Sequence, residues 1–168
     1  KPELPAVGGN EGVGEVVLVG KDVDAFAPLD RVIPSSSGMG TWQSLLMGKE
    51  QDFVKVVSEL PVEYTGMISV NPCTAYRMLK DFATLSPGDT VIQNGSNSGV
   101  GLCVIQIAKA MGLKTINILR SREDNEAKAS ELKALGADVV LTEDDVNGKS
   151  GFHILNGLPK TKLALNCV

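Results

Sequence analysis

The segment VIQNGSNSGVGLCVIQIAKAMG, residues 91–112, decides how the second half of this chain folds. A short apolar run ends in a cluster of small residues, and an apolar-periodic segment follows at once. Gly112 is a typical helix stop, and the apolar residues before it fall on one helix face: Val100, Val104, Ile107, Ala108 and Met111. The pattern predicts a strand, a tight loop and a helix.

Strands and helices continue to alternate toward the C-terminus. A turn at residues 87–89 leads into the first strand, and Asp124 and Gly136 suit the two ends of a second helix. The strands are expected at 90–93, 114–120, 137–143 and 162–168, with a polar, irregular stretch at 144–160 that has room for a short helix. Such alternation is typical of a parallel sheet with right-handed crossovers. The loop after the first strand would then lie where open α/β sheets bind ligands.

The first half of the chain reads differently. Short β-rich runs separated by Gly and Pro indicate a small barrel or meander, with strands at 13–19, 31–33 and 53–57 and a loop at 34–42. Pro61 interrupts the chain, and a helical pattern runs from 67 to 79, where Asn71-Pro72 is either a kink or a helix start.

Composition, net charge and the length of apolar runs argue against several classes of function. The 168 residues are 43% hydrophobic and 21% charged, and the net charge of −4 argues against a general nucleic-acid binder. No apolar run reaches the roughly 20 residues that span a bilayer. The three cysteines, in apolar contexts, are expected to be reduced core thiols, and without a Cys/His cluster a zinc site is not expected.

The loop at 94–101 has the chemistry of a phosphate site. A pyrophosphate needs inward backbone N–H groups and the positive end of a helix. The match to G-x-G-x-x-G is imperfect, because the three glycine positions hold Ser96, Ser98 and Gly101. Serines are tolerable there if their hydroxyls point at phosphate. A plain strand-to-helix turn is the alternative.

A second signal follows the expected strand at 114–120. Many NAD-binding proteins have an acidic residue there for the ribose hydroxyls. This chain instead has Arg120, Ser121 and Arg122, and arginine forks bind phosphate in a bidentate manner. The arginines favour NADP(H), and a solvated turn is the alternative.

Other polar residues carry weaker signals. The amide of Asn71 could donate to and accept from a nicotinamide ribose. Tyr64 and Tyr76 are possible proton donors, but Tyr76 stands in an apolar helical run and is expected in the core, and Tyr64 at the surface. His153 is expected to be exposed.

Several motifs together resemble the zinc-free branch of the medium-chain dehydrogenase/reductase superfamily, and within it the mitochondrial trans-2-enoyl-thioester reductases: GGNEG, GTW, VNPCTAYRML, VIQNGSNSGVG and LALNCV. The resemblance implies an α/β chain, with part of a GroES-like β-barrel domain at 1–70 and the first part of a Rossmann domain at 71–168. It implies NADPH-dependent reduction of enoyl-CoA or enoyl-acyl-carrier-protein thioesters in mitochondrial fatty acid synthesis, by a homodimer.

The resemblance also implies roles for single residues. Asn71 would contact the nicotinamide half of NADPH, and Trp42 would line the substrate cleft. Four residues would wrap the pyrophosphate, namely Asn97, Ser98, Gly99 and Val100. Arg120, Ser121 and Arg122 would hold the adenosine 2′-phosphate. The family's catalytic tyrosine would precede residue 1, so no catalytic residue is assigned in this chain, and Leu29 replaces a glycine usual in the family.

These departures leave alternatives open. The chain is expected to be an internal segment of a longer enzyme, inactive by itself. A quinone or alkenal reductase of the same superfamily is the second hypothesis. A truncated product without catalysis, which binds nucleotide weakly or serves as an interaction module, is the third.

Overall fold

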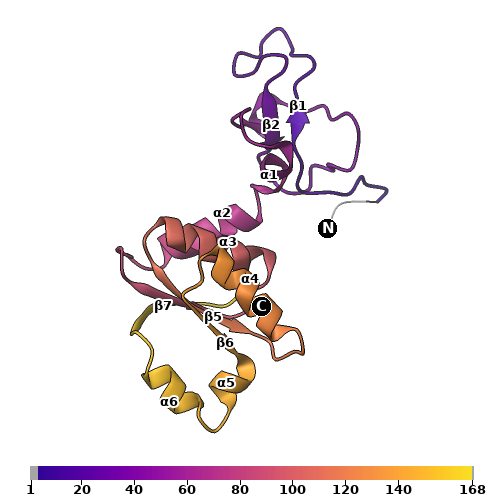
Figure 1. Ribbon diagram of the computed structural model, residues 1–168. Helices are drawn as coiled ribbons and strands as arrows, with labels where there is room; N and C mark the ends of the chain where they lie inside the picture. Colours follow the sequence, from indigo (N-terminus) through magenta and orange to yellow (C-terminus); the bar gives the residue numbers. More distant parts are fainter. Residues whose placement is uncertain (1–3, 168) are drawn as a thin grey trace. The chain divides into compact units, whose positions relative to one another are not determined.

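The structure is a computed structural model that describes residues 4–167. It divides into two compact units, the first ending at Val70 and the second beginning at Asn71 (Figure 1). Residues 1–3, which the first expected domain included, and Val168, the expected end of the last strand, lie outside the described residues.

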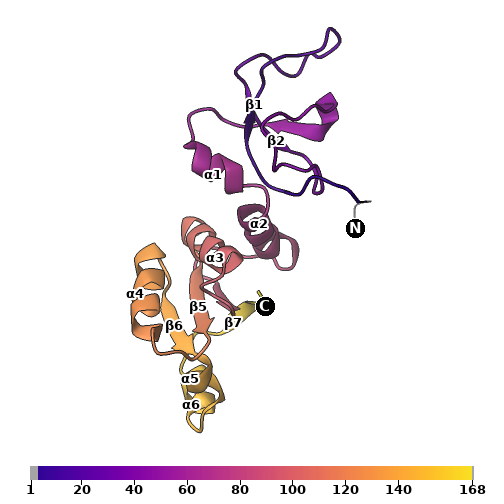
Figure 2. The same cartoon turned by 90° about the vertical axis from the view of Figure 1, so that its right-hand side faces the viewer.

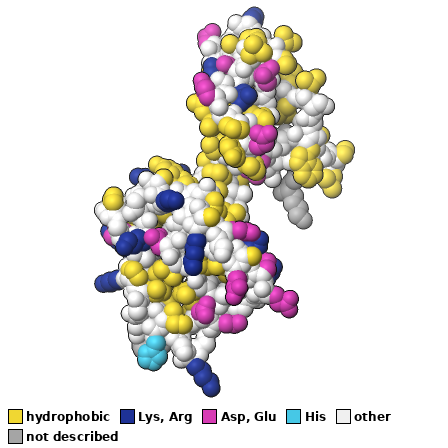
Figure 3. All heavy atoms as spheres, in the orientation of Figure 1, with side chains coloured by type: hydrophobic (Ala, Val, Ile, Leu, Met, Phe, Trp, Pro, Cys, Tyr) yellow, Lys and Arg dark blue, Asp and Glu magenta, His cyan; other side chains and the backbone are white. Residues whose placement is uncertain are grey.

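The first unit contains a three-stranded antiparallel sheet in the order β1-β2-β3. The strands are β1 (Gly14–Glu15), β2 (Arg31–Pro34) and β3 (Phe53–Lys55), with the 3-10 turn η1 (Glu50–Asp52) before β3 and the helix α1 (Val62–Met67) after it. Val32 and Ile33 of the central strand are buried. Figure 3 shows apolar side chains on the surface of this unit, and the exposed ones include Val17, Leu18, Leu45 and Met47.

Two expectations for this unit were wrong. The strand expected at 13–19 is only two residues long, because the pairing ends soon after Val16, which exchanges backbone hydrogen bonds with Asp30 and Leu29. A β-rich run forms a strand only where a partner strand pairs with it. The sequence pattern also missed α1, whose N-cap is Pro61. The strand expected at 31–33 is confirmed as β2, and the expected loop is confirmed from residue 35 to residue 42. The strand expected at 53–57 is confirmed in its first three residues, as β3.

The second unit is a parallel four-stranded sheet in the order β6-β5-β4-β7. Figure 2 labels β5, β6 and β7 of this sheet. Its elements follow one another as α2 (Asn71–Asp81), β4 (Thr90–Gln93), α3 (Gly99–Ala110), β5 (Lys114–Leu119), α4 (Asn125–Leu135), β6 (Val139–Thr142), α5 (Glu143–Asn147), α6 (Gly151–Asn156) and β7 (Thr161–Leu165). The alternation and all four parallel strands are confirmed. The stretch at 144–160 holds two short helices instead of one, and α2 starts at Asn71, so the Asn-Pro pair is a helix start.

Apolar side chains from α2, α3 and α4 form the core against the sheet. One cluster joins α2, α3, β4 and β7, and contains Ala75, Leu79, Val91, Val104, Ala108, Leu113 and Leu165. A second cluster joins α3, β5 and α4, and contains Ile105, Leu119, Leu132 and Ala137. The predicted helix face is confirmed, because Val104 and Ala108 are fully buried and Val100, Ile107 and Met111 pack against the first cluster.

The structure tests where the tyrosines, the cysteines and His153 were expected to lie. Tyr76 lies on the outer face of α2 and is 49% exposed, so its expected place in the core was wrong. All three thiols are free, as expected, but Cys73 is exposed, so its expected place in the core was wrong, and Cys103 and Cys167 are only partly buried. Tyr64 and His153 are exposed, as expected. No helix of the described residues is long and apolar enough to cross a membrane.

Candidate functional site

The loop between β4 and α3 lies at the carboxyl ends of the parallel strands. Ser98 is the N-cap of α3, and its Oγ accepts from the backbone N–H of Gly101 at 3.1 Å. The helix runs for 12 residues, so the positive end of its dipole lies at this loop. A helix N-terminus here has free N–H groups that suit an anion.

Two glycines in this loop are required by close contacts. A Cβ on Gly101 would lie 2.6 Å from the Gly95 carbonyl oxygen and 2.7 Å from that of Ser96, so Gly101 lets α3 approach the loop. A Cβ on Gly99 would lie 2.6 Å from Nδ2 of Asn71. The amide of Asn71 therefore lies directly beside the first turn of α3, and two predicted site residues from separate helices meet.

The two serines of the motif have different roles. Ser96 is fully buried, and its hydroxyl donates to the carbonyl of Ile118 at 3.0 Å. The expectation that it points at phosphate was wrong, because this hydroxyl ties the loop to β5. The oxygen of Ser98 caps the helix, and its proton is left to donate to a ligand.

A buried polar network holds the loop on the sheet. Nε2 of Gln93 donates to the Gly101 carbonyl at 3.0 Å and to Oδ1 of Asn117 at 2.9 Å. Nδ2 of Asn117 donates to Thr115 at 2.9 Å and to the Val139 carbonyl at 3.0 Å. Gln93 and Asn117 are almost completely buried, so this network fixes the first turn of α3 against β4 and β5. Sequence reasoning missed it, because nothing in the local pattern marks these amides as partners.

Beside the loop is a cleft of about 350 Å³ at the carboxyl ends of β4 and β5. It brings together several residues predicted for cofactor binding, and its lining is Gly95, Asn97, Ser98, Leu119, Arg120, Arg122, Asp124, Asn125, Lys128 and Cys167. Arg120 and Arg122 are exposed, and among the described residues neither has a carboxylate within salt-bridge distance. Their charges are available to an anionic ligand.

Some predicted residues lie away from the cleft wall. The Ser121 hydroxyl accepts from the backbone N–H of Asp144 at 3.1 Å, which links the arginine turn to α5. The residues predicted for cofactor binding that do not line the cleft are Asn71, Gly99, Val100 and Ser121. Sequence reasoning missed Lys128, which also lines the cleft. The sequence did contain a signal for it, because Lys128 stands near the start of the helix that follows the arginine turn.

Two further hydrogen bonds join the loop to the end of β7. Nδ2 of Asn94 donates to Oδ1 of Asn166 at 2.9 Å, and Oδ1 of Asn94 accepts from the backbone N–H of Cys167 at 2.8 Å. Burial raises the pKa of the Cys167 thiol, so this thiol at the cleft wall stays protonated at neutral pH and is a poor nucleophile.

The first unit has its own cavity, of about 700 Å³, with a mostly apolar lining that includes Val17, Leu18, Leu45 and Met47. Trp42 is 81% exposed, does not line this cavity, and packs over Gly8 and Gly9. Within the described residues, no group of three or more His, Cys, Asp or Glu side chains could hold a metal ion.

Comparisons with known proteins show that the chain is similar to mitochondrial reductases. It is 53% identical to the mitochondrial enoyl-[acyl-carrier-protein] reductase of Rattus norvegicus over 99% of this chain and 45% of the relative. It is similar to the mitochondrial 2-enoyl thioester reductase Etr1p/Etr2p heterodimer from Candida tropicalis, with 38% identity and a TM-score of 0.87 over 97% of this chain and 50% of the other. The Etr1p complex with NADP and crotonyl-CoA gives 37% identity and a TM-score of 0.89 over the same shares.

The chain therefore spans about half the length of the relatives that it matches. No family model matches it. The expected combination of a GroES-like part and a Rossmann part is confirmed by the antiparallel sheet, the parallel sheet and these neighbours. In sequence and in fold, this chain is therefore similar to about one half of the mitochondrial enoyl-thioester reductases.

Proposed function

We propose that the protein reduces trans-2-enoyl thioesters of coenzyme A or acyl-carrier protein with NADPH. One observation carries the cofactor part of this proposal. The cleft joins the N-terminus of α3 to two arginines that have no carboxylate partner among the described residues. A dinucleotide with a 2′-phosphate needs these two anion sites next to each other. The relatives named above supply the substrate part.

The residues present fit the proposed cofactor. Gly99 and Gly101 are required by packing inside the protein, against the Asn71 amide and against the Gly95 and Ser96 carbonyls. They let the first turn of α3 lie close to the loop, where its free N–H groups can bind a pyrophosphate. Asn97, Ser98, Gly99 and Val100 would surround the pyrophosphate, and Arg120 and Arg122 would bind the 2′-phosphate. Ser121 would position the arginine turn through its hydrogen bond to Asp144.

The amide of Asn71 supports a role near the nicotinamide. It lies beside Gly99, at the end of α3 that faces the sheet's carboxyl edge. When bound, NADPH would supply the hydride for C3 of the enoyl thioester, and an acid would supply the proton for C2. The part of this chain is to bind and orient the dinucleotide, with the Asn71 amide as donor or acceptor for its nicotinamide half. Trp42, exposed on the first unit, would contact the substrate.

The setting of the enzyme is proposed from the same relatives. The relative from Rattus norvegicus is a mitochondrial reductase, and we infer a mitochondrial role in fatty acid synthesis for this protein. A neighbour, Etr1p/Etr2p, is a heterodimer, which supports assembly of two chains. That the two subunits of this protein are identical is our proposal from its resemblance to the family.

Turnover by the full-length protein tests the proposal. NADPH oxidation should accelerate on addition of crotonyl-CoA and stay slow with a quinone of equal concentration. Absorbance at the nicotinamide band measures both rates. Faster reduction of the quinone would show a quinone reductase and overturn the proposed activity, and no turnover of either substrate would overturn both.

A further inference from the structure

Lys128 is a third cation in the cleft. It lies on α4, in the turn that follows the arginine turn, and lines the same cavity as Arg120 and Arg122. Its side chain is 37% exposed, so its amino group can reach both solvent and the cavity. The acidic side chain among the lining residues is Asp124, so the cleft wall has two positive charges in excess. That excess suits a dianionic phosphate monoester.

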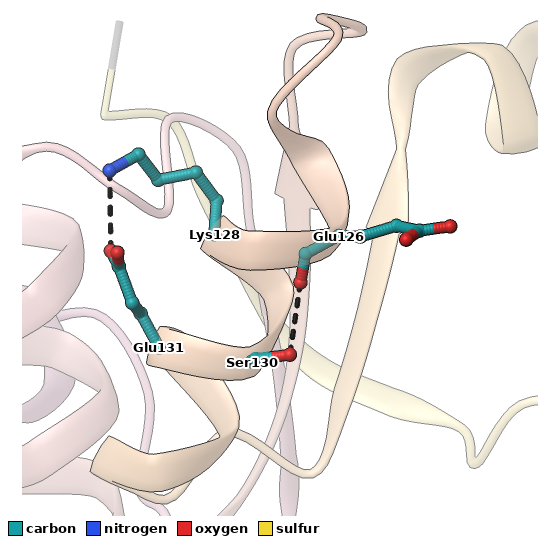
Figure 4. Close-up of polar contacts among 4 residues, drawn as sticks. All are labelled: Glu126, Lys128, Ser130 and Glu131. Atoms are coloured by element: carbon teal, nitrogen blue, oxygen red, sulfur yellow. Dashed lines mark hydrogen bonds and ion pairs between the residues drawn. The ribbon is translucent and has the colours of Figure 1, made fainter.

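Lys128 differs from the two arginines in having a carboxylate partner. Its Nζ lies 3.3 Å from Oε2 of Glu131, one turn further along α4 (Figure 4). Glu131 is 63% exposed, and exposed pairs of this kind contribute little stability because water solvates both ions well. The Lys128 ammonium can therefore exchange this carboxylate for a more highly charged phosphate at small cost.

Neighbouring residues on α4 do not compete for the Lys128 ammonium. The Ser130 hydroxyl donates to the Glu126 carbonyl at 3.0 Å, within the helix, and Figure 4 shows the Glu126 carboxylate pointing away from Lys128. Glu131 is the single acid paired with Lys128 among the described residues.

We propose that Lys128 determines specificity for the 2′-phosphate together with the arginines, and that nucleotide binding transfers its ammonium from Glu131 to the phosphate. Glu131 then acts against nucleotide binding, because it holds Lys128 in the free protein. The inference rests on the proposed use of NADP(H) and names two residues of α4 that set the strength of binding.

The adenine halves of the two dinucleotides give the sharpest test. Calorimetric titration of the full chain with 2′,5′-ADP and with 5′-AMP isolates the 2′-phosphate. Lys128→Met should weaken 2′,5′-ADP binding about tenfold, the effect of one charged hydrogen bond, and leave 5′-AMP binding unchanged. Lys128→Arg should restore most of the loss. Lys133→Met, a lysine on the same helix outside the cleft, is the matched control and should change neither affinity.

Glu131 provides an independent arm. Glu131→Gln should strengthen 2′,5′-ADP binding about two- to fivefold, since it frees Lys128 from an exposed ion pair. The gain should vanish in the Lys128→Met background. Glu126→Gln removes an equal charge from the same helix without freeing Lys128, and should give no gain.

The outcomes separate this inference from the proposed function. Equal binding of 2′,5′-ADP and 5′-AMP by the wild type would overturn both. Preference for 2′,5′-ADP with Lys128→Met indistinguishable from Lys133→Met would overturn the role of Lys128 and leave the proposed cofactor standing. A Glu131→Gln gain that persists without Lys128 would overturn the exchange.

Discussion

At the scale of a single residue, the backbone of Leu29 is strained. Its φ is 76°, and it is the only residue other than glycine with positive φ among the described residues. The left-handed region costs an ordinary residue about 1–2 kcal/mol, which glycine avoids. The resemblance to the reductase family had placed a usual glycine at this position, and the backbone gives the physical reason. Leu29 is also 74% exposed, so its side chain contributes little packing in return.

Leu29→Gly should therefore raise the free energy of unfolding by about 0.5–1 kcal/mol, after the larger chain entropy of unfolded glycine is subtracted. Fluorescence of Trp42, the one tryptophan, reports denaturant unfolding of the first unit. Leu18→Gly is the matched control, because Leu18 is 87% exposed and its φ is not positive. Leu18→Gly should lower the free energy of unfolding. An equal loss in Leu29→Gly would show that the backbone at Leu29 is not strained.

Gly99 is required by a side chain from a neighbouring helix. Gly99→Ala should lower the free energy of unfolding by about 1–3 kcal/mol, since its Cβ would overlap the Asn71 amide and force a shift in a packed site. Thermal or urea unfolding measures the change. In an Asn71→Ala background the penalty should fall below about 0.5 kcal/mol, because the overlapping atoms are gone.

The control for this prediction is Gly14→Ala, where an added Cβ meets nothing within 4 Å. It should cost less than about 0.5 kcal/mol apart from any effect of strand propensity. A Gly99→Ala penalty of the same size with and without Asn71 would show that the contact does not matter.

At the scale of elements, sequence patterns predicted the helices and strands whose signals are local in the sequence. The turn at 87–89 fixed the start of β4, and both ends of α3 followed from its small-residue loop and Gly112. Other features depend on contacts distant in sequence. The buried hydroxyl of Ser96, the Gln93–Asn117 pair and the position of Lys128 arise only when β5 and α4 pack beside the loop. A local pattern contains no information on these partners.

The turn before β4 is tied to β7 by an ion pair. Nζ of Lys162 lies 2.7 Å from Oδ2 of Asp89. The hydrogen bond from Lys162, with a second from the Ser86 backbone N–H, lowers the pKa of Asp89 below its ordinary value of 3.8. A carboxyl with a lowered pKa stabilises the fold above its unfolded pKa, and this contribution is lost as the pH falls through the folded value.

Stability of the second unit should therefore fall between about pH 5 and pH 2, and Asp89→Asn should flatten part of that fall. Urea unfolding at several pH values, followed by circular dichroism, measures it. Asp24→Asn is a suitable control, because the Asp24 carboxylate has no hydrogen bond or ion pair among the described residues. If Asp89→Asn and wild type lost stability in parallel, the ion pair would contribute nothing.

At the scale of the whole molecule, the two units carry different binding features. The second unit has the loop, the helix N-terminus and the cations that a dinucleotide requires. The first unit has an apolar cavity and an exposed tryptophan. Neighbours that match 97% of this chain with TM-scores near 0.9 have both parts, and one of them is a complex with NADP and crotonyl-CoA. In the proposed reaction the second unit binds the cofactor, and Arg120 and Arg122 are the residues at which cofactor choice can be measured.

The central claim of the proposed function is that Arg120 and Arg122 select NADPH over NADH as the cofactor. The most direct measurement is kcat/KM for NADPH and for NADH with crotonyl-CoA, in the wild type and in Arg120→Ala/Arg122→Ala of the full-length protein. The double variant should lose about a hundredfold or more with NADPH, from two charged hydrogen bonds, and change little with NADH. Arg77→Ala, on α2 and outside the cleft, should change neither value. Equal losses with both cofactors in the double variant would contradict the account.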